Sequence, residues 1–291
     1  MRLFIEGDSK AKKNNAPLSR LKDRLRKESA NKCKRAFRFV GKEEKHDLAI
    51  KSTKGCVQFK IKDDICVNNH MEHMHKHFNV SVQETDTLIS ILRSASDFYW
   101  HLRHCPSSSI KYTSNITFEC YQLVESDTKG YTDLIPGSRN LYQDKKIVIN
   151  ADDASSDRKG WRRYGYKITN NLDFPLYAAL FYFDVGDLSI VSYHLPPVAR
   201  EGQAEFSIHA KKSLTIGFGD GGGDPKSHAL KKRQKVDVGF LKLYLSTQYV
   251  DFSGIPQSSP LQQDRAIYDN PLPPPSFWDI LMIPVIQKRG P

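Results

Sequence analysis

Four histidines lie close together in the segment His70-Met71-Glu72-His73-Met74-His75-Lys76-His77. Imidazole nitrogens bind zinc, copper and nickel, so His70, His73, His75 and His77 are the candidate metal ligands of this chain. Their spacing fits no established structural zinc pattern, and the ammonium group of Lys76 opposes a bound cation. The competing interpretation is a polar connecting loop, and we expect no cofactor.

The cysteines are the candidate nucleophiles. A cysteine protease needs a thiolate that a nearby imidazole activates. The caspase signature, Gln-Ala-Cys followed by a variable residue and Gly, is absent from the sequence. Cys56, Cys66 and Cys120 lie in or beside strand-like runs, as is typical of small core side chains. We therefore predict that the chain is not an enzyme and has no catalytic residues.

The positive charge is concentrated in one segment. Residues 1–60 hold 18 Lys and Arg against 7 Asp and Glu, which accounts for the whole net charge of +11. A basic patch binds polyanions by releasing counterions, so one function to consider is nonspecific binding of nucleic acid or an anionic surface through residues 10–35. The other interpretation is a solvated helix face. The candidate polyanion-binding residues are Arg20, Arg24, Arg26, Lys27, Lys34 and Arg35.

Two helices precede the part of the chain that is rich in strands. Pro17 opens the first, which reaches about Asn31 and carries Leu18, Leu21 and Leu25 on one face. The second covers residues 84–104 and has a wide apolar stripe that ends before Pro106. The stripe consists of Leu88, Ile91, Leu92, Ala95, Phe98, Tyr99 and Leu102. His101 and His104 are expected on the surface of this helix.

From residue 110 the apolar pattern changes to period 2 with frequent turn signals, which is typical of a β-sandwich. The predicted fold class is α+β, with a small N-terminal α/β unit, a linking amphipathic helix and an antiparallel β-sandwich. The corresponding domains are a basic α/β unit over residues 1–80, the helix over 84–104, a sandwich over 110–256 and a Pro-rich tail over 257–291.

Several stretches, in their order and spacing, resemble the region that follows the caspase-like domain in fungal caspase-domain (peptidase family C14) proteins. They are Asp97–Leu102, Tyr164–Asn170, Leu180–Asp184 with Leu188–Ile190, Leu214–Gly219, and Val236–Thr247 with Tyr249–Asp251. The resemblance extends to about Pro260 and is strongest over residues 164–256. In such proteins the catalytic His-Cys dyad belongs to the preceding domain, so the resemblance implies a non-catalytic accessory or protein-interaction module. The partner it implies is a caspase-like domain.

No apolar run approaches the roughly 18–20 residues of a membrane-spanning helix. The apolar run at the N-terminus is too short for a signal peptide. We therefore expect a cytoplasmic or nuclear protein whose cysteines are reduced.

Overall fold

The computed structural model describes residues 1–6, 16–29, 37–74, 80–105, 111–128, 131–153, 160–197, 204–231, 234–260 and 278–289. The chain divides into two compact units. Unit 1 consists of Met1–His104, Phe183–Ile190 and Gln257–Ile267, and unit 2 of Cys105–Tyr182, Val191–Pro256 and Tyr268–Pro291. The fold is α+β with a β-rich, sandwich-like body, as predicted.

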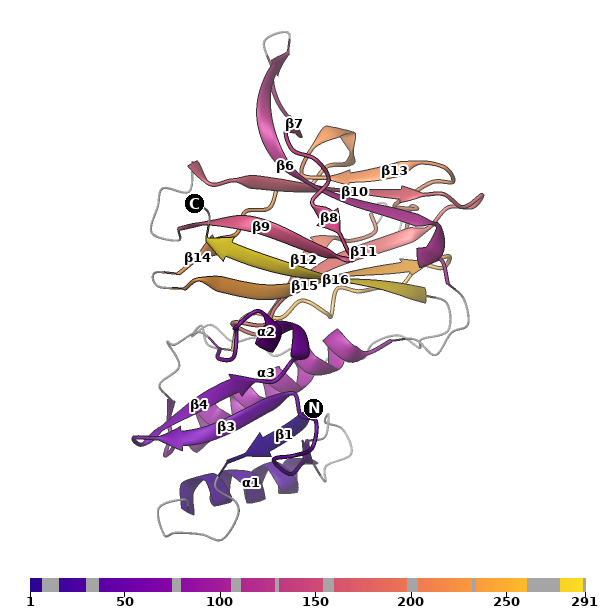
Figure 1. Ribbon diagram of the computed structural model, residues 1–291. Helices are drawn as coiled ribbons and strands as arrows, with labels where there is room; N and C mark the ends of the chain where they lie inside the picture. Colours follow the sequence, from indigo (N-terminus) through magenta and orange to yellow (C-terminus); the bar gives the residue numbers. More distant parts are fainter. Residues whose placement is uncertain are drawn as a thin grey trace. The chain divides into compact units, whose positions relative to one another are not determined.

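A five-stranded sheet of order β2-β1-β3-β4-β5 forms the centre of unit 1 (Figure 1). β1 runs parallel to β2 and to β3, whereas β3 with β4 and β4 with β5 are antiparallel. The parallel strands therefore begin at the same edge of the sheet. The strands are β1 (Arg2–Ile5), β2 (Arg38–Phe39), β3 (Leu48–Thr53), β4 (Cys56–Ile61) and β5 (Val80–Ser81).

Three helices complete unit 1: α1 (Ala16–Ser29), α2 (Asp64–Asn68) and α3 (Thr85–Arg103). The apolar stripes predicted for the two long helices are confirmed, because every side chain in them is buried. α1 and α3 contact each other, and Arg24 of α1 forms a 2.7 Å ion pair with Asp86 of α3. The expected linking helix is thus α3, a packed element of unit 1. His101 is also buried, so its expected surface position is wrong.

Unit 2 contains a four-stranded sheet of order β13-β10-β6-β7, in which all neighbours are antiparallel. The 3-10 turns η2 (Thr113–Asn115) and η4 (Gly219–Gly221) adjoin β6 and β13. Figure 1 shows β6 and β7 continuing as a hairpin beyond the rest of this sheet. The four strands are β6 (Ile116–Thr128), β7 (Tyr131–Pro136), β10 (Arg163–Asn170) and β13 (Ser213–Ile216).

The second sheet has seven strands in the order β12-β11-β15-β16-β9-β14, and β8 also pairs with β9. It is mixed, because β9 runs parallel to both β16 and β14. The edge strand β12 (Ser189–His194) begins with residues that belong to unit 1 and continues with residues that belong to unit 2. The strands are β8 (Tyr142–Gln143), β9 (Lys146–Asp153), β11 (Tyr177–Asp184), β12 (Ser189–His194), β14 (Ala229–Leu230), β15 (Val236–Ser246) and β16 (Trp278–Arg289).

The core of unit 2 lies between these two sheets. Phe118, Tyr166 and Ile168 of the four-stranded sheet and Leu241 and Leu243 of the seven-stranded sheet belong to one buried cluster. On the opposite face of β15, the ring of Tyr244 contacts those of neighbouring aromatic side chains, which are Phe181, Phe252 and Trp278. Burial on both faces explains why β15 is apolar almost throughout.

The expected Pro-rich tail is wrong for residues 278–289. They form β16, which lies between β15 and β9 and pairs with β15 over its whole length. Trp278, Ile283 and Val285 are buried there, so this segment is part of the sandwich core. Pro284 is tolerated because the pairing of β16 with β9 begins only at Val285.

Candidate functional site

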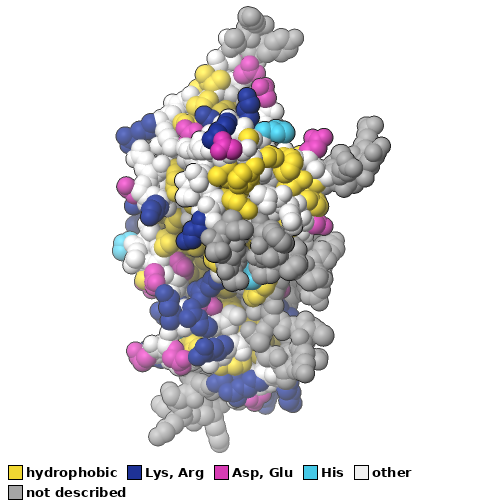
Figure 2. All heavy atoms as spheres, turned by 90° about the vertical axis from the view of Figure 1, so that its right-hand side faces the viewer, with side chains coloured by type: hydrophobic (Ala, Val, Ile, Leu, Met, Phe, Trp, Pro, Cys, Tyr) yellow, Lys and Arg dark blue, Asp and Glu magenta, His cyan; other side chains and the backbone are white. Residues whose placement is uncertain are grey.

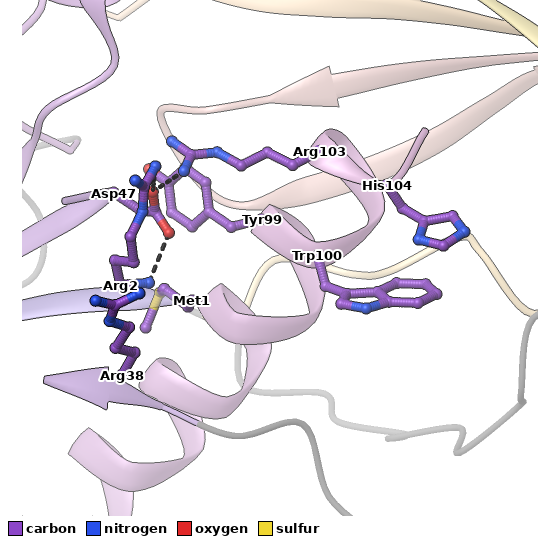
Figure 3. Close-up of a pocket in the computed structure, with 8 residues that line it drawn as sticks. All are labelled: Met1, Arg2, Arg38, Asp47, Tyr99, Trp100, Arg103 and His104. Carbon is purple, nitrogen blue, oxygen red and sulfur yellow. Dashed lines mark hydrogen bonds and ion pairs between the residues drawn. The ribbon is translucent and has the colours of Figure 1, made fainter. Parts of the chain in front are cut away.

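Unit 1 contains a pocket of about 390 Å³ at the edge where its parallel strands begin (Figure 3). Its wall combines basic, aromatic and acidic side chains. The residues that line it are Met1, Arg2, Arg38, Asp47, Tyr99, Trp100, Arg103 and His104.

Four separate segments of the chain meet at this pocket. Arg2 begins β1, Arg38 begins β2, and the two residues are register partners in the parallel pair. Asp47 directly precedes β3, which pairs with the other edge of β1. The last turn of α3 adds Arg103 and ends at its cap, His104. The sheet topology therefore brings three arginines to one place from distant positions in the sequence.

Asp47 connects two of these arginines. One carboxylate oxygen accepts a 2.7 Å hydrogen bond from the backbone N–H of Arg2, and the other lies 3.4 Å from an Nη atom of the Arg2 guanidinium. Arg103 forms an ion pair with the same carboxylate (Figure 3). The Asp47 side chain is only 3% exposed, whereas those of Arg2 and Arg103 are about a third exposed. The buried carboxylate thus holds two partly exposed guanidinium groups in place.

Arg38 is the most exposed of the three arginines, with 75% of its side chain accessible. Among the described residues, its ion-pair partner is Glu44, at 4.0 Å, which is the outer limit of an ion pair. Glu44 also accepts a 2.8 Å hydrogen bond from the backbone N–H of Gly41. An exposed pair of this length contributes little free energy, so Arg38 is available to an incoming anion.

Tyr99 lines the pocket and carries a buried hydroxyl. The residue is 2% exposed, and its hydroxyl has no hydrogen-bond partner among the described residues. Burial raises the pKa of Tyr99 well above its ordinary value, with smaller contributions from Cys66 and Asp47, so the hydroxyl remains protonated and can donate. The guanidinium of Arg103 lies 5.7 Å from the centre of the Tyr99 ring, within the range of a cation–π contact.

Trp100 and His104 also line the pocket, and Figure 3 shows their rings on the side of α3 away from Asp47. They are four residues apart on α3, so their side chains lie on the same helix face. Their rings are stacked, with centroids 4.5 Å apart and an angle of 19° between the planes. Together, these side chains can bind an anion and contact the group that carries it.

Four of the six predicted polyanion-binding residues, Arg20, Arg24, Arg26 and Lys27, lie on α1. Arg24 is paired with Asp86, and Arg26 lies 3.8 Å from Asp23. Arg20 and Lys27 are exposed on α1, while Lys34 and Arg35 lie outside the described residues. On the face shown in Figure 2, Lys and Arg side chains lie in separate groups with acidic side chains among them.

Of the predicted metal ligands, His70 and His73 are described and exposed, whereas His75 and His77 lie outside the described residues. His70 has a positive φ of 62°, and His73 forms an isolated bridge with Lys60. Within the described ranges, no group of three or more His, Cys, Asp or Glu side chains is placed to hold a metal ion.

Two of the cysteines are deeply buried. Cys66 of α2 and Cys120 of β6 are 0% and 1% exposed. Burial raises the pKa of the Cys120 thiol far above its ordinary value, which keeps it protonated and unreactive. Cys56 is half-buried, Cys105 is exposed, and Cys33 lies outside the described residues.

The pocket residues were not predicted as a site. Tyr99 belongs to the apolar stripe predicted for the second helix and to the run Asp97–Leu102 that carries the family resemblance, whereas Arg2, Arg38 and Asp47 have no distinguishing local motif. Their one common signal is that each charged residue directly begins or precedes a short strand. That signal identifies a site only after the strand order is known.

Among the described helices, none is long and apolar enough to cross a membrane. Comparisons with protein-family models, with curated proteins and with solved structures found no match to this chain.

Proposed function

We propose that this chain is a non-catalytic protein-interaction module that binds an acidic group of its partner in the pocket of unit 1. The observation that carries the proposal is the convergence of Arg2, Arg38 and Arg103 on one pocket in which Asp47 is the single carboxylate among the described residues. Guanidinium groups bind carboxylates and phosphates through paired N–H donors, which suits them to acidic side chains.

A non-catalytic role is consistent with the burial of Cys66 and Cys120, because cysteines buried in a core are chemically inert. The partner we propose is a caspase-like domain, on the basis of the family resemblance of this chain. We place the protein in the cytoplasm or nucleus of a fungal cell on the same basis. Turnover of a peptide with Asp or a basic residue before the scissile bond, abolished by a single Cys→Ala change, would contradict the proposal.

The binding test uses a short peptide with a central glutamate flanked by neutral residues. Its affinity for the full chain is measured by calorimetry at low and at physiological ionic strength. We expect Arg38→Gln to weaken binding about tenfold, as for loss of a charge-assisted hydrogen bond. Equal affinity of the wild type and this variant would contradict the use of the pocket.

A second function is polyanion binding through α1, supported by the exposure of Arg20 and Lys27 on that helix. The discriminating variant is the double change Arg20→Gln with Lys27→Gln, tested against a single-stranded oligonucleotide at increasing salt. Polyanion binding through α1 requires that the double variant lose affinity and that the salt dependence become weaker. Salt-independent or unaltered binding would reject this second function.

A further inference from the structure

The pocket carries more positive charge than a carboxylate can neutralise. Among the described side chains that line the pocket, three arginines face one carboxylate, so these side chains have an excess of two positive charges. A glutamate or aspartate of a partner would leave one of these charges uncompensated. A phosphate monoester carries a charge of about −1.5 to −2 at neutral pH, so it compensates nearly the whole excess of positive charge.

The carboxylate of Asp47 does not directly repel a phosphate monoester in the pocket. Its side chain is 3% exposed, and its two oxygens are engaged by the backbone and guanidinium of Arg2 and by Arg103. Its role is to orient two arginines whose other N–H groups remain available on the pocket side, since each guanidinium has five N–H donors. Arg38 adds a third, more exposed set of donors.

The buried Tyr99 hydroxyl is the second, independent observation. Tyr99 lines the pocket, and its hydroxyl has no hydrogen-bond partner among the described residues, although buried hydroxyls are nearly always paired. A carboxylate has two oxygens to distribute among donors, whereas a phosphate monoester has three. The three arginines together with Tyr99 supply donors from more directions than a carboxylate can use.

The size of the pocket indicates that more than a phosphate group enters it. A volume of about 390 Å³ lies in the range of pockets that hold small organic ligands. The stacked rings of Trp100 and His104 provide a flat surface for the organic group to which the phosphate is attached.

We propose that the pocket of unit 1 binds a phosphate monoester, with Arg2, Arg38 and Arg103 as its charge partners and the Tyr99 hydroxyl as an additional donor. This inference rests on the proposed interaction function, and under it the phosphate is carried by a phosphorylated side chain of the partner protein. A free small phosphate monoester has the same chemistry, and the test below separates the two sources.

The experiment measures binding to the full chain of four probes: the glutamate peptide, the same peptide with phosphoserine in place of the glutamate, free phosphoserine and inorganic phosphate. We expect the phosphopeptide to bind at least about tenfold more tightly than the glutamate peptide, and its affinity to fall between about pH 7 and pH 5 as the phosphate takes up a proton. Equal affinity of the two peptides would overturn the inference and leave the proposed function standing. Failure of all four probes to bind would overturn both the phosphate inference and the proposed interaction function.

Phosphoserine or inorganic phosphate that binds as tightly as the phosphopeptide would support the phosphate site and overturn the protein partner. Tyr99→Phe and Arg38→Gln should each weaken phosphopeptide binding about tenfold. The matched control is Lys62→Gln, which removes one exposed positive charge of unit 1 outside the pocket and should leave the affinity within about twofold. An effect of Lys62→Gln as large as that of Arg38→Gln would show nonspecific attraction and overturn the assigned site.

Discussion

Replacing His228 by phenylalanine should remove a large part of the acid sensitivity of unit 2. His228 is 5% exposed, and its Nε2 atom has no hydrogen-bond partner among the described residues. Its ring contacts the edges of Tyr164 and Tyr182, with centroids 5.9 and 5.3 Å away. Phenylalanine keeps these ring contacts and removes the titratable nitrogen atoms.

The magnitude follows from the pKa of this histidine. Burial lowers the pKa of His228 from 6.5 to about 4, because the charged imidazolium would lose its hydration. Between these two values the unfolded chain binds more protons than the folded one, so the stability of the wild type falls as the pH falls from 6.5 to 4. At 1.36 kcal/mol per pKa unit, a pKa shift of this size lowers the unfolding free energy by about 3 kcal/mol. This loss is reached in full only below about pH 4.

The assay is denaturant unfolding at a series of pH values between about 7.5 and 4, followed by tryptophan fluorescence, to which the buried Trp278 of unit 2 contributes. The difference in unfolding free energy between His228→Phe and the wild type should grow by about 3 kcal/mol over this range. Other acid-sensitive groups, such as His194, whose pKa burial also lowers to about 4, contribute equally to both proteins and cancel.

The control is His209→Gln, a change at an exposed histidine of the same unit, which should leave the unfolding free energy at pH 7 within about 0.5 kcal/mol of the wild type. A pH-independent difference for His228→Phe would refute the reasoning. An NMR titration of the His228 ring in the wild type, with a midpoint near pH 6.5, would refute it without relying on any variant.

The remaining predictions concern packing and buried polar groups. Gly239→Ala should lower the unfolding free energy by about 3 kcal/mol, because an added Cβ atom would clash with the Tyr182 hydroxyl; unchanged thermal stability would contradict this contact. Lys242→Met should remove a pH-dependent part of the unfolding free energy, since burial lowers the pKa of Lys242 from 10.5 to about 8. The wild type, unlike this variant, should gain stability as the pH rises from about 8 to 10.5, which pH-dependent denaturation would test. Tyr99→Phe should raise the unfolding free energy by about 1 kcal/mol, because it removes a buried hydroxyl without a partner among the described residues; a clear loss in chemical denaturation would point to a structural role instead. Phe240→Ala, at a side chain 1% exposed, should cost about 3–5 kcal/mol, and a variant as stable as the wild type would refute the core position.

The elements predicted from local pattern agree with the structure where the pattern is strong. The leucines of α1 and the apolar stripe of α3 are buried as their helical spacing indicates. The long apolar run of β15 forms an interior strand between β11 and β16. Both results follow from periodicity and burial preference, which depend on neighbours within a few residues in the sequence.

β16 shows where local pattern was insufficient. Its sequence follows a Pro-rich stretch and contains Pro284, and both features argue against an interior strand. The strand exists because β15 pairs with it along its full length and β9 pairs with its second half, leaving Pro284 just outside the parallel pairing. Because β9 and β15 are separated from β16 in the sequence, the pattern of residues around β16 does not reveal that it pairs with them.

The sequence alone determined the two amphipathic helices, the β-rich body and the concentration of charge in residues 1–60, because these properties depend on composition and short-range periodicity. Only the tertiary structure decided which charges lie together. Arg2, Arg38, Asp47 and Arg103 become neighbours because β1, β2 and β3 run parallel and begin at one edge, where α3 ends. Tertiary burial likewise decided that Tyr99 and His228 hold polar atoms away from water, since the exposure of a side chain depends on the segments that pack over it.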